Sequence, residues 1–333
     1  MCGGRLNKMR IHNAIQQSSD LVTSHEATRS VFIEMALEKN RKATPFISEA
    51  KHIREISRQI KNPWDLLKTN ALQGAILTAC GISDKALKFF NDSDKMEAAT
   101  NFIRNFLEPA GEAFPDELTY RFLITRGDTL GGMMRNFAGK VGESKFTDYL
   151  LAALRVNKID YYMWIKTKNK YTLHGSNLFE QQHYYDIKAL HWVYEEKPYL
   201  LIYNTNVPAI EKNIDLSLIA YKPILSDYDV ITDAVNFMTE NPSGILGFGE
   251  LKGGIDPAGA DEHWKTGNSA LQRIRDAYGP HKLNPKTFFI AAAIQKAMAD
   301  EIYKQYQKEI LSNAANLTSE KQMVSLVEWL IKL

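Results

Sequence analysis

The spacing of hydrophobic residues divides the chain into a helical first part and a second part that contains strands. Between about residues 20 and 61, apolar side chains recur every three or four positions, as at Ile53, Ile56 and Ile60, which is the period of an amphipathic helix. Pro45 marks a new helix start within this range. Further helices are predicted over residues 63–79, from Ser83 as N-cap to Phe90, and over residues 94–107, 115–124 and 146–151.

The pattern changes after the last of these helices, where short runs rich in Tyr, Ile, Val and Trp predict β-strands. Strands are predicted over residues 160–165, 189–194, 199–203, 214–220 and 245–252, followed by a helix over 261–277, a buried strand over 287–293 and closing helices over 295–311 and 319–332. The predicted fold is therefore mixed α/β (α+β), with a large N-terminal helical region of residues 1–145 and a second region of residues 146–333.

Charged residues end the apolar run of residues 245–252 and require an explanation. Glu250 and Lys252 are two positions apart, so a strand directs them to the same face, and two glycines follow. An earlier predicted strand carries Asp215. If the two strands pair, Asp215 and Glu250 converge on one divalent cation, with Lys252 beside the water that the cation activates.

Phosphodiester hydrolysis needs a cation of this kind, because the reaction develops charge on phosphorus and requires an acidified water. Mg²⁺ prefers one or two carboxylates plus waters, and the carbonyl of Leu251 is a plausible third ligand. The residues therefore indicate a metal-dependent phosphodiesterase. The alternative is a surface salt bridge between Glu250 and Lys252. Other acids compete with Asp215 for the first ligand position but lie in no predicted strand: Asp227, Asp229 and Asp233.

His263 is a further candidate, in the first turn of the helix predicted after the glycines. Histidine has an ordinary pKa near ~6.5, so it can act as a base or hold the attacking water. A capping or surface role is the alternative interpretation of a histidine in the first turn.

Glycines and arginines lie together in residues 126–136, which include Arg126 and Arg135. Exposed backbone N–H groups and guanidinium groups both suit phosphate oxygens, so this segment is a candidate phosphate contact. It is not a Walker loop, because Val141 stands where a Mg²⁺-binding Ser or Thr is needed. A plain turn is the alternative.

Composition and charge indicate the class of protein and the kind of partner to expect. The 44% hydrophobic and 24% charged content is that of an ordinary globular protein, and the two cysteines cannot form a disulfide framework, which favours the cytoplasm. No stretch approaches the roughly 20 apolar residues of a membrane span, so no membrane partner is expected.

Residues 1–170 hold 26 Lys+Arg against 19 Asp+Glu, a net of +7, which leaves 15 against 20, or −5, for the remainder. This asymmetry favours a first part that holds a polyanion.

The segment of residues 250–266, Glu-Leu-Lys-Gly-Gly-Ile-Asp-Pro-Ala-Gly-Ala-Asp-Glu-His-Trp-Lys-Thr, resembles the active-site segment of the AvaI/BsoBI family of type II restriction endonucleases. The likeness extends to residues 36–46, 120–132 and 212–216, and so covers nearly the whole chain. It implies a restriction-endonuclease-like PD-(D/E)xK core, whose order of elements agrees with the predicted one. The helical region would then clasp DNA.

The resemblance also implies an activity: a Mg²⁺-dependent homodimer that cleaves double-stranded DNA at the palindrome CYCGRG and leaves four-base 5′ overhangs. Asp215, Glu250 and Lys252 match the family's catalytic residues, and His263 matches a histidine beside the attacking water. Two further matches imply contacts with bases, by Asp256 and by Lys85. A carboxylate can accept from a cytosine amino group, and a lysine can donate to purine acceptors.

Alternatives remain for several of these assignments. Asp256 before Pro257 is also an ordinary turn pair, and Lys85 an ordinary helix-surface lysine. Residues 221–244 are longer than the family leads us to expect, which leaves room for a different first acid. The alternative functions are a PD-(D/E)xK nuclease of other sequence specificity and a non-catalytic DNA-binding protein with the same fold. A cognate DNA methyltransferase is expected in the same system, because an unopposed cutter would kill its host.

Overall fold

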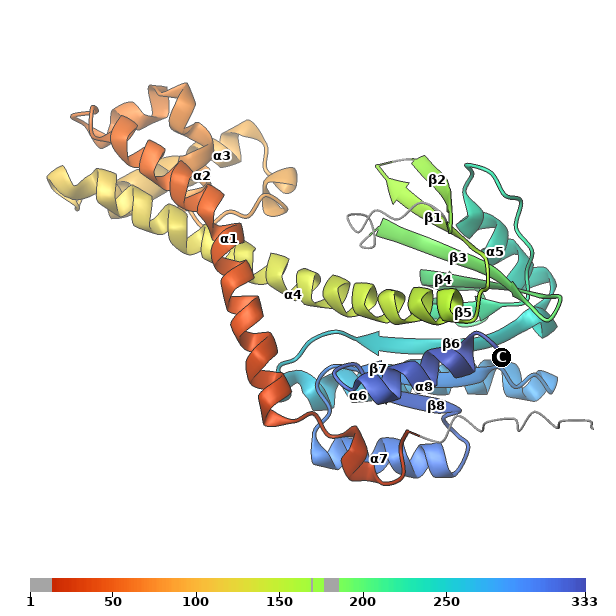
Figure 1. The fold of residues 1–333 in the computed structure, drawn as a ribbon. Helices are drawn as coiled ribbons and strands as arrows, with labels where there is room; N and C mark the ends of the chain where they lie inside the picture. The colour runs from red at the N-terminus through yellow and green to blue at the C-terminus, as the bar shows by residue number, and fades with distance from the viewer. Residues whose placement is uncertain (1–13, 169, 177–185) are drawn as a thin grey trace, which may run out of the picture. The chain divides into compact units, whose positions relative to one another are not determined.

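The computed structural model describes residues 14–168, 170–176 and 186–333, which form a mixed α/β fold with a large N-terminal helical region (Figure 1). The chain divides into two units, which we call the helical unit (residues 32–137) and the sheet unit (residues 1–31 and 138–333). The helical unit thus ends eight residues before the predicted boundary at 145, and residues 14–31 belong with the sheet.

The helical unit is built around one hydrophobic core. Buried side chains from its successive helices meet there, among them Ile53, Ile76, Phe102 and Phe122. Its elements are α1 (His25–Ser57), the 3₁₀ helices Pro63–Lys68 and Asn70–Leu72, α2 (Gln73–Ala79), the 3₁₀ helix Ala86–Phe89, α3 (Asp92–Phe102), the π-helix Ile103–Leu107, the 3₁₀ helix Gly111–Ala113 and α4 (Phe114–Val156). Helices α1 and α4 each continue into the sheet unit.

Pro45 lies inside α1 and does not start a new helix, so that prediction was wrong. An internal proline removes the hydrogen bond to the carbonyl four residues earlier, which belongs to Arg41. Both Pro45 and Arg41 are exposed, so water can satisfy that carbonyl. The predicted helix over Ser83–Phe90 is only a 3₁₀ turn, although Ser83 accepts a hydrogen bond from the Ala86 amide at 3.2 Å, as a cap would.

The glycine-rich residues 126–136 form neither a phosphate-binding loop nor a turn, because they lie in the interior of α4. Their backbone N–H groups are therefore committed to the helix. Phe122, Leu130 and Met134 share one face at spacings that are multiples of four, and all three are buried. This apolar stripe holds the segment helical despite its glycines, which each cost about 1 kcal/mol relative to alanine.

The sheet unit contains one eight-stranded sheet, of order β2-β1-β3-β4-β5-β6-β7-β8. Neighbours are antiparallel from β2 through to β6, and β6, β7 and β8 are parallel. The strands are β1 (Tyr161–Thr167), β2 (Lys170–Gly175), β3 (Ile187–Tyr194), β4 (Lys197–Val207), β5 (Lys212–Ile219), β6 (Ile245–Lys252), β7 (Lys286–Ala291) and β8 (Asn313–Asn316). The predicted strands correspond to six of these, whereas β2 and β8 were not predicted.

Helices cover both faces of this sheet and create a core on each side. Residues 138–156 of α4 pack on one face together with α8 (Glu320–Leu330), through side chains such as Leu150 and Leu326. The other face is covered by α5 (Val230–Glu240), α6 (Pro257–Tyr278) and α7 (Lys296–Gln307). Figure 1 shows these layers around the strands. The segment 221–244 thus contributes α5, which was not predicted, to one of the covering layers.

Thr23 anchors the start of the chain to the last strands. Its hydroxyl donates to the carbonyl of Ala292 at 2.8 Å and accepts from the amide of Ile294 at 2.9 Å and the side chain of Asn316 at 2.8 Å. All of these bonds are buried. In the described part of the chain, no helix is long and apolar enough to cross a membrane.

Candidate active site

Asp215, Glu250 and Lys252 meet where the end of β6 passes the first half of β5. The two strands pair, and they are antiparallel. The pair Leu216 and Gly249 sets a register that, continued by one residue, puts Asp215 opposite Glu250. The ammonium group of Lys252 donates to Asp215 Oδ2 at 2.9 Å and to Glu250 Oε2 at 2.6 Å. The amide of Leu251 donates to the same Asp215 oxygen at 2.8 Å. The two carboxylates therefore converge on a single positive charge.

Burial distinguishes this group from a surface salt bridge. Glu250 is 3% exposed. Burial raises the pKa of the Glu250 carboxyl to about 7, and the negative charge of Asp215 adds to the effect, while Lys252 opposes it. Burial by itself lowers the pKa of the Lys252 ammonium, but the charges of Asp215 and Glu250 outweigh it and raise that pKa. Such perturbed, coupled groups are typical of functional sites.

The carboxylates fit a hard divalent cation, because their oxygens already converge on one cationic group and Mg²⁺ prefers such ligands. Among residues 14–168, 170–176 and 186–333, no three His, Cys, Asp or Glu side chains form a cage for a metal ion. Mg²⁺ does not need one, since it usually keeps several waters and binds through one or two carboxylates.

Two glycines bring α4 against the end of β6. A Cβ atom on Gly142 of α4 would lie 2.5 Å from the Cα of Gly253, and one on Gly253 would lie 2.4 Å from the carbonyl oxygen of Ala138. Only glycine allows so close a backbone contact. The contact lies directly after Lys252 and makes α4 one wall of the site.

Glu143, the next residue on α4, is a candidate that the sequence reasoning missed. Its carboxylate accepts a hydrogen bond from Asn204 at 2.7 Å. Burial raises the pKa of the Glu143 carboxyl, Asn204 and Lys188 oppose this, and the charge of Asp215 raises it further. A glutamate inside a long helix, outside any motif, gives no signal of such a position.

Helix α6 forms a second wall and carries His263. The Nε2 atom of His263 lies 3.3 Å from the position of a Cβ on Gly254, directly after Lys252 and Gly253. One helical turn later, Gly267 faces Glu250, since its Cβ would lie 3.4 Å from that of Glu250. The histidine therefore points to the turn that follows the predicted catalytic residues.

The competing acids have other partners. Asp227 accepts from the Leu173 amide at 2.8 Å, and Asp229 caps the start of α5. Asp233 lies in α5 and accepts from the Tyr221 hydroxyl at 3.2 Å. None of the three is hydrogen-bonded to Glu250 or Lys252 among the described residues, so the geometry favours Asp215 as the first acid.

Comparison with known proteins gives the family. Residues 11–333 match the family model for restriction endonuclease BsobI. The chain belongs to this restriction endonuclease family. It is 45% identical over 319 residues to the type II restriction enzyme AvaI of Nostoc sp. and to AvaI of Anabaena variabilis, covering 96% of this chain and 98% of each relative. It is 43% identical over 323 residues to the type II restriction enzyme BsoBI of Geobacillus stearothermophilus, with the same coverage.

Asp256 and Lys85, which the family likeness leads us to expect as base-contacting residues, lie on exposed turns. Asp256 is the N-cap of α6 and accepts from the amide of Ala258 at 3.0 Å, with Pro257 as the first helical residue. It thus has the local role of a capping residue, and its second oxygen faces no recorded donor. Lys85 is exposed at the N-cap of the 3₁₀ turn of the helical unit.

Arg126 and Arg135 differ in their surroundings although both lie on α4 in the helical unit. The Arg126 side chain is 17% exposed, lies 3.2 Å from Asp84 and 3.9 Å from Glu49, and its guanidinium stands over the rings of Phe46 and Phe122. Arg135 is exposed and has no recorded ion pair among the described residues. Arg135 is therefore available to a phosphate. Arg126 could bind a phosphate only by giving up its ion pairs with Asp84 and Glu49.

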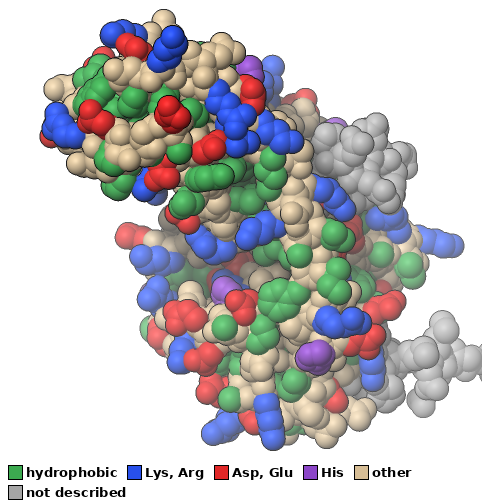
Figure 2. Space-filling model, turned by 90° about the vertical axis from the view of Figure 1, so that its left-hand side faces the viewer, with side chains coloured by type: hydrophobic (Ala, Val, Ile, Leu, Met, Phe, Trp, Pro, Cys, Tyr) green, Lys and Arg blue, Asp and Glu red, His purple; other side chains and the backbone are tan. Residues whose placement is uncertain are grey.

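The positive charge of this family member is concentrated outside the helical unit. Residues 32–137 hold 15 Lys+Arg against 14 Asp+Glu, a net of +1, and residues 138–170 hold 7 against 3, a net of +4. Figure 2 shows side chains of both signs interspersed over each unit on the face drawn. Most of that +4 lies after α4: residues 138–156 hold 3 Lys+Arg against 2 Asp+Glu, a net of +1, and residues 157–170 hold 4 against 1, a net of +3.

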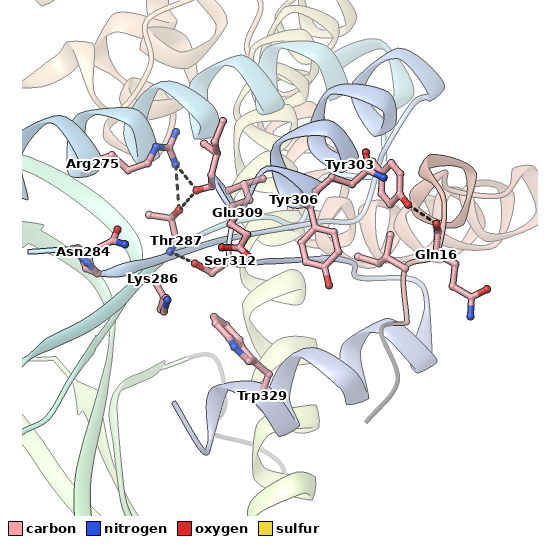
Figure 3. Close-up of a pocket in the computed structure, with 15 residues that line it drawn as sticks. Gln16, Arg275, Asn284, Lys286, Thr287, Tyr303, Tyr306, Glu309, Ser312 and Trp329 are labelled. Atoms are coloured by element: carbon pink, nitrogen blue, oxygen red, sulfur yellow. Dashed lines mark hydrogen bonds between the residues drawn. The ribbon is translucent and has the colours of Figure 1, made fainter. Parts of the chain in front are cut away.

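A pocket of about 880 Å³ lies away from the candidate site. It opens at the start of β7, beside Lys286 and Thr287, whereas Lys252 pairs with Ala291 at the other end of that strand. Figure 3 shows Arg275 donating to Thr287 there, with Trp329 on the opposite wall. None of the predicted site residues lines this pocket.

Proposed function

We propose that this chain is a type II restriction endonuclease that hydrolyses double-stranded DNA with Mg²⁺. One observation carries the proposal: Asp215 and Glu250 converge on Lys252 between two paired strands, in a chain of the BsobI restriction endonuclease family. The sheet unit is then the restriction-endonuclease-like PD-(D/E)xK core, and the helical unit clasps the DNA.

The roles of the side chains follow from their positions. Asp215 and Glu250 would hold the Mg²⁺, with the carbonyl of Leu251 as a further ligand. The metal supplies neutralisation of phosphate charge and acidification of a water. Lys252 lies beside both carboxylates, so its ammonium group can donate to the attacking water and to a phosphate oxygen. His263, on the α6 wall, accepts from or orients that water.

The sequence specificity is proposed from the relatives and the resemblance. AvaI and BsoBI are named as type II restriction enzymes, and we propose that this chain shares the CYCGRG site and the four-base 5′ overhangs implied by that family. Asp256 and Lys85 contact bases, and Arg126 and Arg135 contact phosphates. A palindrome presents two equivalent strands, so a two-fold homodimer with one site in each subunit cuts both.

Digestion of a plasmid tests the proposal. With Mg²⁺, the protein should produce discrete fragments whose mapped ends lie at CYCGRG, and Lys252→Ala should abolish cutting while binding to that site persists. Ends at another sequence would indicate a nuclease of other specificity. A folded dimer that binds DNA but cuts nowhere with any divalent metal would indicate a non-catalytic DNA-binding protein.

A further inference from the structure

Glu143 is a carboxylate of α4 whose pKa is raised by burial and, to a smaller extent, by the charge of Asp215. It lies far from the motif of residues 250–266 in the sequence. Its surroundings fix it closely, because three separate contacts hold this part of α4 beside β4 and the turn after β6.

The first contact is the backbone approach of Gly142 to Gly253, which fixes the helix against the turn after Lys252. The second is one turn further along α4, where the Thr147 hydroxyl and the Tyr203 hydroxyl lie 2.9 Å apart in the buried core. Glu143 lies between these two contacts. Its position relative to the ends of the strands is therefore determined by rigid packing and not by a flexible loop.

The third contact orients the carboxylate itself. Asn204 donates to Glu143 Oε2 at 2.7 Å. The pairs Tyr203 with Leu216 and Thr205 with Ile214 place Asn204 opposite Asp215 on the neighbouring strand. Asn204 has a positive φ of 52°, in the left-handed region that asparagine tolerates better than most residues. The hydrogen bond thus directs the Glu143 carboxylate toward the strand position of Asp215.

Within the described ranges of the chain, the hydrogen bond from Asn204 uses Oε2 of Glu143, and none is seen to Oε1. Glu143 is half-buried rather than solvent-exposed. A half-buried carboxylate oxygen of this kind can accept a hydrogen bond from water. Carboxylates that bind metal-coordinated waters typically tune affinity about 10–100-fold.

We propose that Glu143 is a positioning residue of the active site, which accepts a hydrogen bond from the hydration shell of the divalent cation held by Asp215 and Glu250. Asn204 keeps this carboxylate in place. The inference rests on the proposed function, since it assumes that the cation binds there. A role in the hydration shell agrees with the absence of a three-carboxylate cage among the described residues.

The inference can be tested by measuring Mn²⁺ binding in the absence of DNA. The EPR signal of the free ion reports how much Mn²⁺ is unbound. Glu143→Gln keeps the size of the side chain and an acceptor for Asn204 but removes the charge. It should weaken Mn²⁺ binding about tenfold and raise the Mg²⁺ concentration for half-maximal cleavage by a similar factor. Cleavage at saturating Mg²⁺ should largely recover. Asn204→Gly, which tolerates the positive φ, should produce a smaller shift in the same direction.

Asp148→Asn is the matched control, because Asp148 lies on the same helix, is exposed, and is not coupled to Asp215. It should bind Mn²⁺ as the unchanged protein does. If Asp215→Asn loses Mn²⁺ binding but Glu143→Gln stays within about twofold of the unchanged protein, the role of Glu143 is wrong. If Asp215→Asn also binds Mn²⁺ normally, the proposed metal site itself is wrong.

Discussion

Gly142 of α4 and Gly253 after β6 meet backbone to backbone, so closely that a Cβ on Gly142 would lie 2.5 Å from the Cα of Gly253. The contact joins the helix that carries Glu143 to the turn that follows Lys252. The candidate site therefore depends on two residues that have no functional groups.

Gly253→Ala should separate α4 from this turn, because its new Cβ would lie 2.4 Å from the carbonyl oxygen of Ala138. Overpacking of this kind costs about 1–3 kcal/mol, and displacement of the site should reduce cleavage at least tenfold. Chemical denaturation and a cleavage assay measure the two effects. Gly139→Ala is the control on the same helix: nothing lies within 4 Å of its Cβ, so it should raise stability by up to about 1 kcal/mol. Unchanged stability and cleavage in Gly253→Ala would contradict the contact.

Asp215 should be the first acid of the site, and Asp227 should not. Asp215→Asn removes the charge that faces Lys252 and should lower cleavage by three orders of magnitude or more, on the order of 4 kcal/mol of transition-state stabilisation. Asp227→Asn removes a charge but keeps an oxygen that can accept from the Leu173 amide, so this variant should cut at nearly the normal rate. Single-turnover cleavage at saturating Mg²⁺ compares the two. If Asp227→Asn lost cleavage and Asp215→Asn kept it, the first acid of the site would lie in the segment of residues 221–244.

The stability of the metal-free protein should fall with rising pH through the titration of Glu250. Burial raises the pKa of this carboxyl to about 7 in the folded state, above its ordinary value of 4.5. The folded state therefore binds more protons than the unfolded state between these values, so the contribution is fully present below the lower value and is lost as pH rises to the upper one. Thermal unfolding in EDTA at about pH 5.5 and about pH 8 measures the loss.

Glu250→Gln provides the control for that measurement, since an amide does not titrate and the pH dependence should become shallower. Added Mg²⁺ should stabilise the unchanged protein more at the higher pH, because the cation binds the ionised carboxylate and competes with the proton. Equal pH dependence in the two proteins would show that Glu250 is not the titrating group.

Substitutions of Arg126 and Arg135 should differ in their effect on the stability of the protein. If both contact phosphates, each change to Gln should reduce the slope of log K against log salt by about one unit. Only Arg126→Gln should also destabilise the helical unit, by about 1–2 kcal/mol, since its guanidinium stands over Phe46 and Phe122. Binding titrations at several salt concentrations and thermal unfolding provide both quantities. A salt slope that Arg135→Gln leaves unchanged would remove this residue from the DNA interface.

The sequence predicted the strands that carry the site better than the helices around it. The strand over residues 245–252 has the predicted bounds, because a short apolar run ended by charges and two glycines is a clear local signal. Strand alternation and pairing were enough to bring Asp215 and Glu250 together. The short strand β8 and the edge strand β2 were missed, since neither has the long apolar pattern of a central strand.

Helix α4 shows where local reasoning failed. Gly127, Gly131 and Gly132 indicate a turn when read alone, and only the buried face of Phe122, Leu130 and Met134 makes the helix continuous. The same helix carries Glu143, whose importance depends on a hydrogen bond to residue 204 and on a backbone contact with residue 253. Contacts across such sequence distances leave no pattern in one sequence.

The buried bonds of Thr23 also constrain how the protein is made. Its partners in the last strands lie 269 to 293 residues further along the chain. Ribosomes add about 5–20 residues per second, so roughly 15–55 s pass between the synthesis of Thr23 and the synthesis of these partners. The nascent sheet unit cannot close around its core in that interval, so it is complete only after Asn316 has been translated.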